Sequence, residues 1–215
     1  MKTIKTLTVL TMAGMFTIAC KNEKKDDIQL EDHSTEMAAE TAKTSETMAN
    51  ETAMRAKIDE EAKMARENSI SGLASSNAEL STLSASLKTA ELDSMLMKPG
   101  TYTVFAPSNH AFEKLPEKTR EKLMLPENKS ELTNLLQYHV VAGVITSDKL
   151  DSAIKSNGGK YSFKTVQGEE LTAMNDGDQI VIKDAKGNKA QVIKGNVEAS
   201  NGIVYIIDDV LMSKR

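Results

Sequence analysis

The sequence contains a single cysteine, no tryptophan and only 4% aromatic residues. One cysteine cannot form an internal disulfide, which excludes a small protein stapled by disulfide bonds. The scarcity of aromatic side chains leaves little surface on which nucleic-acid bases could stack, and 27 basic residues are outnumbered by 31 acidic ones. The composition therefore excludes a basic nucleic-acid-binding protein and a polytopic membrane protein. It indicates a globular domain with additional segments.

The first twenty residues have the features of an export signal. Lys2 and Lys5 provide a basic start, and residues 7–19 form an apolar stretch of 13 residues. A helix of that length falls well short of the hydrocarbon core of a bilayer, about 30 Å thick, so residues 1–19 are interpreted as a signal peptide. Cys20 follows directly, and its surroundings resemble the lipobox of bacterial lipoproteins, in which this cysteine is acylated. A secreted protein with an incidental cysteine is the alternative.

Residues 20–68 differ in composition from the rest of the chain. They contain no glycine, proline or aromatic residue, and acidic residues outnumber basic ones. So few apolar side chains cannot build a core, although the many Ala, Glu, Met and Lys residues favour a helix. The sequence therefore predicts an acidic stalk that is partly helical or disordered. A coiled coil is the alternative, but Arg55 would then lie in the seam with Met48 and Ala62.

The residues that follow Cys20 bear on localisation. The next residue is Lys21, and the absence of aspartate there resembles the pattern of lipoproteins that reach the outer membrane. The Lys-Asp-Asp cluster at residues 25–27 resembles surface-export signals of some bacteria. We therefore expect an exported protein that is lipid-anchored to the outer membrane, on the cell surface or otherwise facing the periplasm.

Residues 69–215 have the composition of a folded domain. All four prolines and ten of the eleven glycines lie between Gly72 and Gly202, as a chain with many tight connections requires. The first half favours helices, with apolar residues at helical spacing over 80–96 and 130–138, a further helix after Pro116, and Ser108 as an N-cap.

The second half of this domain favours strands. Apolar and β-branched residues predict strands over 101–105, 161–166, 170–174, 179–183, 190–200 and 203–207. Asn201-Gly202 predicts a hairpin turn in which both residues have positive φ, and the apolar run that follows suits a strand buried on both faces. Helices followed by a β-rich half predict an α+β fold.

Three segments of this domain carry a family resemblance. They are Thr103-Val-Phe-Ala-Pro-Ser-Asn-His-Ala-Phe112, Leu136-Gln-Tyr-His-Val-Val-Ala-Gly143 and Ala199-Ser-Asn-Gly-Ile-Val-Tyr-Ile-Ile-Asp208. Their order and spacing resemble the two signatures and the central Tyr-His segment of the fasciclin (FAS1) domain, over residues 69–213. Two departures are Tyr205, where many relatives carry histidine, and His110, where an acidic residue is common. The resemblance implies the FAS1 fold, with a helical half packed on a β-rich wedge.

The resemblance also implies a function without catalysis. FAS1 domains mediate adhesion or bind protein and polysaccharide partners, which predicts a binding module at the cell envelope with no cofactor. The segment implicated in receptor binding by animal relatives corresponds here to Leu135, Leu136, Tyr138, His139, Val140 and Val141. A carrier of an apolar small molecule, with a cavity of a few hundred Å³ between helices and sheet, is one alternative. A structural spacer in an envelope assembly is another.

Each of these residues also has a structural interpretation. His139 ends an apolar helix and can be a buried or capping histidine, and Asn109 can close its own turn. Asp176 with Asp178, and Asp208 with Asp209, lack the number of ligands that a calcium loop needs, so no metal site is expected. The three histidines form no HExxH motif, and the sequence contains no GxSxG elbow or phosphate-binding glycine loop, so an enzyme is not expected.

Overall fold

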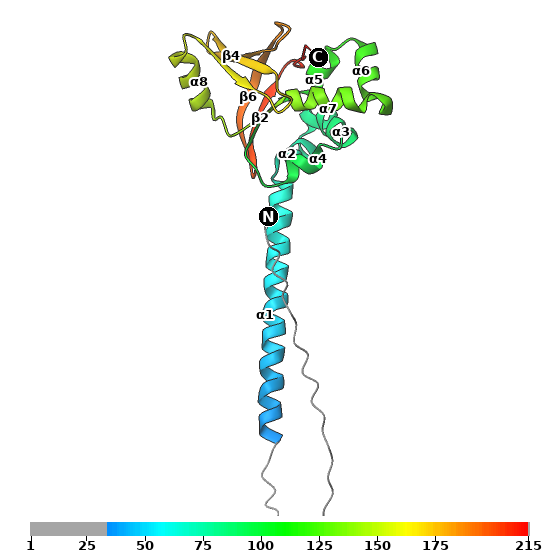
Figure 1. Ribbon diagram of the computed structural model, residues 1–215, viewed down its shortest axis with the longest axis vertical. Helices are drawn as coiled ribbons and strands as arrows, with labels where there is room; N and C mark the ends of the chain where they lie inside the picture. Colours follow the sequence, from blue (N-terminus) through cyan, green and yellow to red (C-terminus); the bar gives the residue numbers. More distant parts are fainter. Residues whose placement is uncertain (1–33, 215) are drawn as a thin grey trace, which may run out of the picture. The chain divides into compact units, whose positions relative to one another are not determined.

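The computed structural model describes residues 34–214 (Figure 1). The predicted signal peptide, Cys20 and the first part of the stalk lie outside the described residues. The remainder of the predicted stalk forms α1 (Ser34–Glu67). Within the described part of the chain, no helix is long and apolar enough to cross a membrane.

The domain that follows α1 alternates short helices with strands. The helices are α2 (Ile70–Ser76), η1 (Ala78–Leu80), α3 (Ser81–Thr89), α4 (Asp93–Met97), α5 (Asn109–Glu113), α6 (Glu117–Met124), η2 (Pro126–Asn128), α7 (Lys129–Tyr138) and α8 (Ser147–Ser156). The strands are β1 (Tyr102–Pro107), β2 (Val140–Ala142), β3 (Lys160–Lys164), β4 (Glu170–Asp176), β5 (Gln179–Lys183), β6 (Lys189–Ala199) and β7 (Gly202–Ile207). They form one sheet of order β2-β1-β7-β6-β5-β4-β3, which confirms the predicted α+β fold.

The strands β1 and β7 form a parallel pair next to the β2 edge of the sheet, whereas the other strand pairs are antiparallel. Side chains of β7 alternate between two hydrophobic cores, with Val204 and Ile206 on one side and Ile203, Tyr205 and Ile207 on the other. The prediction of a strand buried on both faces is therefore confirmed.

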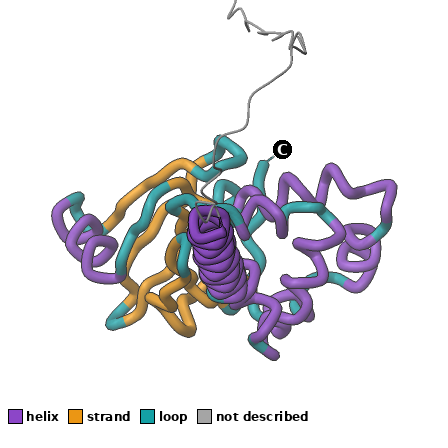
Figure 2. The backbone as a smooth tube through the Cα atoms, turned by 90° about the horizontal axis from the view of Figure 1, so that it is seen from below, coloured by secondary structure: helices purple, strands orange, loops and turns teal. Residues whose placement is uncertain are grey.

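The two cores lie on opposite faces of the β1–β7 pair. Helices α2 to α7 cover one face, while the strands from β3 to β6 and α8 enclose the other (Figure 2). In the second core the ring of Phe105 stacks on Phe163 at 5.6 Å and on Tyr205 at 5.5 Å between centroids. A bridge between Val141 and Thr165 brings the two ends of the sheet together, so that the sheet curls around this core.

Short side chains start several of the helices. Ser69, Ser108 and Thr146 each precede a helix in an extended conformation and accept a hydrogen bond from a backbone N–H of its first turn. Asn109 does not close its own turn. Its Oδ1 accepts from the Thr82 N–H at 2.9 Å and its Nδ2 donates to the Ala78 carbonyl at 2.8 Å, which links α5 to η1 and α3.

The Asn201-Gly202 turn departs from the predicted geometry. Asn201 has no positive φ, and Gly202 is required because a Cβ there would lie 2.0 Å from the Tyr102 carbonyl oxygen. The Asn201 side chain is buried, with Oδ1 accepting from the Ile70 N–H at 2.9 Å and Nδ2 donating to the carbonyls of Leu96 (2.6 Å) and Lys98 (3.0 Å). This one side-chain amide therefore joins the hairpin to the start of α2 and to the end of α4.

The end of α1 is capped by the domain. Ser200 Oγ donates to the Ala65 carbonyl at 2.7 Å, and the Ser200 N–H donates to the Asn68 carbonyl at 2.8 Å. Ser69 Oγ donates to the Arg66 carbonyl at 2.6 Å. These bonds satisfy carbonyls that a helix end leaves without partners, so residues 65–68 belong structurally to the domain.

We expect Asn201→Ala to destabilise the domain by about 3 kcal/mol, because three backbone groups, two of them in buried hydrogen bonds, lose their partner at once. Urea unfolding followed by circular dichroism measures the free energy of unfolding. Asn175→Ala is the matched control, since that exposed asparagine makes a single side-chain bond, to Asp151, and should change stability by less than about 0.5 kcal/mol. Equal losses in the two variants would contradict the role assigned to Asn201.

Candidate functional site

The segment predicted to bind a partner spans the end of α7 and β2. Leu135, the most accessible of its six residues, is 6% exposed, and Leu136, Tyr138, His139, Val140 and Val141 are each 3% exposed or less. Side chains that are this deeply buried hold the fold together and offer almost no surface to a macromolecule. These residues were predicted to contact a partner, but only Leu135 has a side chain that is accessible to one, and only in part.

His139 is the C-cap of α7, and both nitrogens of its buried ring are hydrogen-bonded. Nε2 accepts from the Leu211 N–H at 3.0 Å, so the proton is on Nδ1, which donates to the Leu135 carbonyl at 2.8 Å. Burial lowers the pKa of His139 to about 4, although the bond to Leu135 and the nearby Asp184 favour the charged ring. The predicted alternative, a buried and satisfied capping histidine, is confirmed.

Tyr138 is buried beside His139 and its hydroxyl connects two distant parts of the sheet. The hydroxyl donates to the Glu170 carbonyl at 3.1 Å and accepts from the Ala185 N–H at 2.8 Å. Burial raises the pKa of Tyr138 to about 12. The phenol is therefore neutral at physiological pH and ties α7 to β4 and to the β5–β6 turn.

The last residues of the chain are held by side-chain acceptors from three elements. Besides the bond from Leu211 to His139, the Met212 N–H donates to Asp184 Oδ2 at 3.0 Å and the Lys214 N–H donates to Glu169 Oε2 at 2.9 Å. Asp184 is buried and also accepts two bonds from Asn188. The role of Asp184 was not predicted, although an aspartate that opens an Asp-Ala-Lys-Gly-Asn turn is a signal for such bonding.

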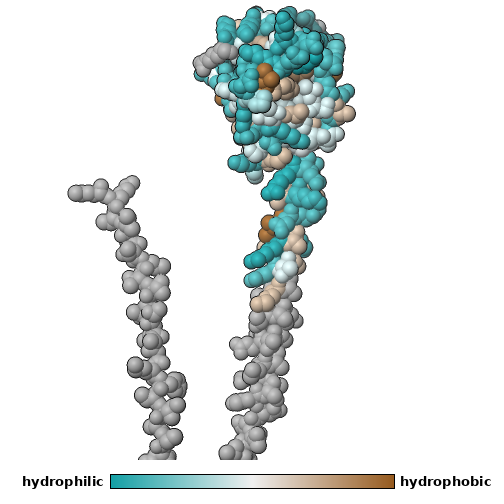
Figure 3. All heavy atoms as spheres, turned by 90° about the vertical axis from the view of Figure 1, so that its right-hand side faces the viewer, coloured by the Kyte–Doolittle hydropathy of each residue, from teal (hydrophilic) through white to brown (hydrophobic). Residues whose placement is uncertain are grey.

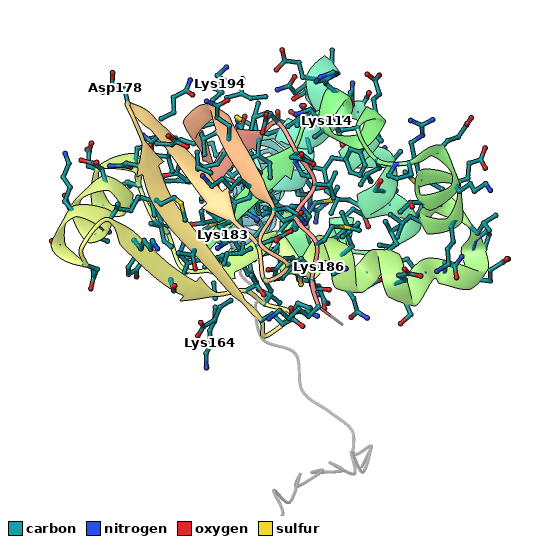
Figure 4. All side chains as sticks on the ribbon, turned by 90° about the horizontal axis from the view of Figure 1, so that it is seen from above. Lys114, Lys164, Asp178, Lys183, Lys186 and Lys194 are labelled. Atoms are coloured by element: carbon teal, nitrogen blue, oxygen red, sulfur yellow. The ribbon has the colours of Figure 1, made fainter. Side chains whose placement is uncertain are left out.

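A surface groove lies beside the buried segment. It has a volume of about 420 Å³ and is lined by Leu123 and Leu135 at its base, by Asn134 and Glu127, and by Lys186 on the β5–β6 turn. Figure 4 shows Lys186 and Lys183 on neighbouring parts of this turn and strand. The predicted partner-binding segment contributes to this accessible groove through one residue, Leu135.

The space between the helices and the sheet is nearly filled. The apolar cavity there, lined by residues such as Leu83, Leu96 and Val204, has a volume of about 10 Å³. That is room for about one water molecule, whereas an apolar cargo needs roughly 300 Å³ or more. The cavity that a small-molecule carrier requires is therefore absent from this part of the described structure.

The paired aspartates serve the fold. Asp208 Oδ1 accepts from the Gln191 N–H at 2.7 Å and Oδ2 from Lys114 Nζ at 3.1 Å, while Asp209 accepts from the Val210 N–H at 2.8 Å. Among the residues that the structure describes, no group of three or more His, Cys, Asp or Glu side chains is arranged to hold a metal ion.

The low pKa of His139 makes stability depend on pH. The unfolded histidine titrates near 6.5 and the folded one near 4, so between these values the unfolded chain binds more protons. The free energy of unfolding should therefore fall as pH is lowered from about 6.5 to 4, by up to about 3 kcal/mol, and this contribution should change no further below 4.

The measurement is urea unfolding at pH 7, 5.5 and 4 for the native chain and for His139→Gln, which cannot titrate. The variant should be less stable at pH 7, and the difference between the two proteins should shrink as pH falls. A constant difference across this range would show that another group causes the acid sensitivity.

Comparison with known proteins places these features in a family. The fasciclin domain matches residues 78–213 of this chain. Protein sll1483 of Synechocystis is 42% identical over 142 residues, which cover 65% of this chain and 71% of that protein. The cell surface glycolipoprotein MPB83 of Mycobacterium bovis is 35% identical over 144 residues, which cover 65% of this chain and 58% of that protein.

The fold is also found among solved structures. A FAS1 domain pair from the insect cell adhesion molecule fasciclin I superposes with a TM-score of 0.62 at 19% identity, covering 68% of this chain and 51% of that one. The likeness extends to the α+β architecture described above. The family match, the sequence relatives and the shared fold agree, and this chain belongs to the fasciclin domain family.

Proposed function

We propose that the protein is an exported, membrane-anchored module that binds a protein or polysaccharide partner at the cell envelope without catalysis. The observation that carries the proposal is the combination of a fasciclin domain with Cys20 at the end of an apolar export signal. A relative that is 35% identical is a cell surface glycolipoprotein, which supports the same location for this chain.

The interior of the domain supports binding over catalysis. All buried side-chain polar atoms among the described residues have a hydrogen-bond partner. His139, Tyr138 and Asp184 use their polar atoms to hold backbone groups of other elements. A catalytic group must instead be free to meet a substrate. The exposed grooves are the surfaces that a partner can reach.

Trypsin added to intact cells that produce the protein tests where the domain lies. The part of α1 nearest the domain exposes Arg55, Lys57 and Lys63, whereas the compact domain protects its own chain. We expect release of a fragment containing residues 69–214 while a periplasmic marker stays intact. Protection until the cells are lysed would contradict exposure on the surface and favour a spacer inside the envelope.

Cys20→Ala tests the anchor. Cys20 lies outside the domain, so the variant should keep the melting temperature of the native domain. It should lose incorporation of labelled palmitate and appear in the soluble fraction or as an unprocessed precursor. Fractionation and palmitate labelling of both proteins give the result. A variant that is still processed and acylated would overturn the lipoprotein assignment.

A further inference from the structure

The strand β6 is irregular in its second half. Its pairing with β7 shifts between Val192 and Lys194 and again between Lys194 and Val197. Asn196, within this stretch, has a positive φ of 56°. A bulge of this kind re-aims side chains, and left-handed backbone at a residue other than glycine costs free energy that the surrounding structure must offset.

The bulge leaves an apolar side chain in solvent. Ile193 is 60% exposed, compared with 42% for Leu125 and 40% for Val166, the other exposed large apolar side chains of the domain. The face of the domain seen in Figure 3 is mostly hydrophilic. The side chain of Ile193 is therefore accessible to a partner.

Ile193 lines one of two adjoining hollows between β6 and the helices. The first has a volume of about 310 Å³ and an apolar floor that includes Leu73, Val197 and Ile206. The second, of about 480 Å³, is lined by Ile193. Ala78 lines both hollows, which therefore adjoin at this residue. We name the two hollows together the β6 groove.

The charge at the Ile193 end of the β6 groove is negative. Glu79 and Glu113 both line the second hollow. Glu113 lies 3.4 Å from the exposed His110, which also lines this hollow, and Glu79 has no ion pair among the described residues. The two nearby lysines, Lys114 and Lys194 (labelled in Figure 4), do not line the hollow, and Lys114 is held by Asp208. A basic group is the charge that this end would attract.

The helical wall of the groove is fixed in place. The Asn109 side chain holds the Ala78 carbonyl and the Thr82 N–H, which joins η1 and α3 to α5. A wall that is already ordered lowers the entropy cost of binding.

The length of the groove along β6 suits an extended peptide. Ile193 and Val197 are four residues apart, which is at most about 14 Å of chain, and an extended segment beside them spans this distance with about four residues. From this geometry we infer that the β6 groove binds an extended segment of a partner protein. An apolar side chain of that segment occupies the first hollow, and a lysine or arginine three to four residues away faces Glu79 and Glu113. The inference rests on the proposed binding function and names its surface and partner class.

Peptide selection tests the inference on the whole chain from residue 21. A phage library of random decapeptides is selected against the protein, and enriched peptides are synthesised and titrated by fluorescence anisotropy. We expect them to carry an apolar residue and a basic residue three to four positions apart. Their affinity should fall at least about tenfold for Ile193→Asp and for the double variant Glu79→Lys, Glu113→Lys.

Matched variants on other surfaces provide the controls. Val166→Asp adds a charge at another exposed apolar residue, and Glu117→Lys with Glu121→Lys reverses two exposed charges on α6. Both should bind the peptides within about twofold of the native chain, and circular dichroism confirms that every variant is folded. No enrichment, enrichment of acidic peptides, or equal binding to all variants would overturn the inference. The trypsin and Cys20 experiments do not involve the groove, so they test the proposed function independently of this inference.

Discussion

The parallel pairing of β1 with β7 is the constraint on which the rest of the domain depends. These strands are about 100 residues apart in the sequence, and their side chains point into two cores at once. Because neither face is open to water, each strand must be apolar at successive positions, and any polar atom on it needs a partner. The Tyr205 hydroxyl, for example, donates to the Ile145 carbonyl at 2.8 Å. The helices and the curled sheet exist to cover these two faces.

Local sequence signals predicted the elements because their causes are local. The apolar spacing over 130–138 and the Ser108 cap describe contacts within a few residues, and α7 and α5 formed there. The bridge from Val141 to Thr165 and the bond from Asn201 to the Ile70 N–H, across 131 residues, depend on where distant segments meet. No periodicity in the chain encodes such contacts, so the closure of the sheet and the use of the Asn201 side chain were not predictable.

The candidate site shows the same division. The resemblance pointed to the Tyr-His segment as the place where a partner binds, but a motif gives positions in the chain and says nothing of exposure. In the structure Tyr138 and His139 are buried. Tyr138 accepts a hydrogen bond from the β5–β6 turn, and His139 accepts one from the Leu211 N–H near the end of the chain. In the same way, the strand expected over residues 190–200 formed as β6, but its irregular pairing with β7 was not predicted. The Gly195-Asn196 pair inside it was the signal for a bulge, because glycine within a strand marks irregular pairing or close approach.

The accessible chemistry of the domain follows from how its polar groups are used. The buried histidine, tyrosines and Asp184 form hydrogen bonds with backbone atoms. A substitution at any of them therefore affects the stability of the fold and does not directly change a surface that binds a partner. The ion pairs lie at the surface, where each contributes little to stability. Recognition can therefore vary on this fold through exposed side chains such as Ile193 and the glutamates near it, while the two cores stay unchanged. A family that shares one interior can in this way bind different partners.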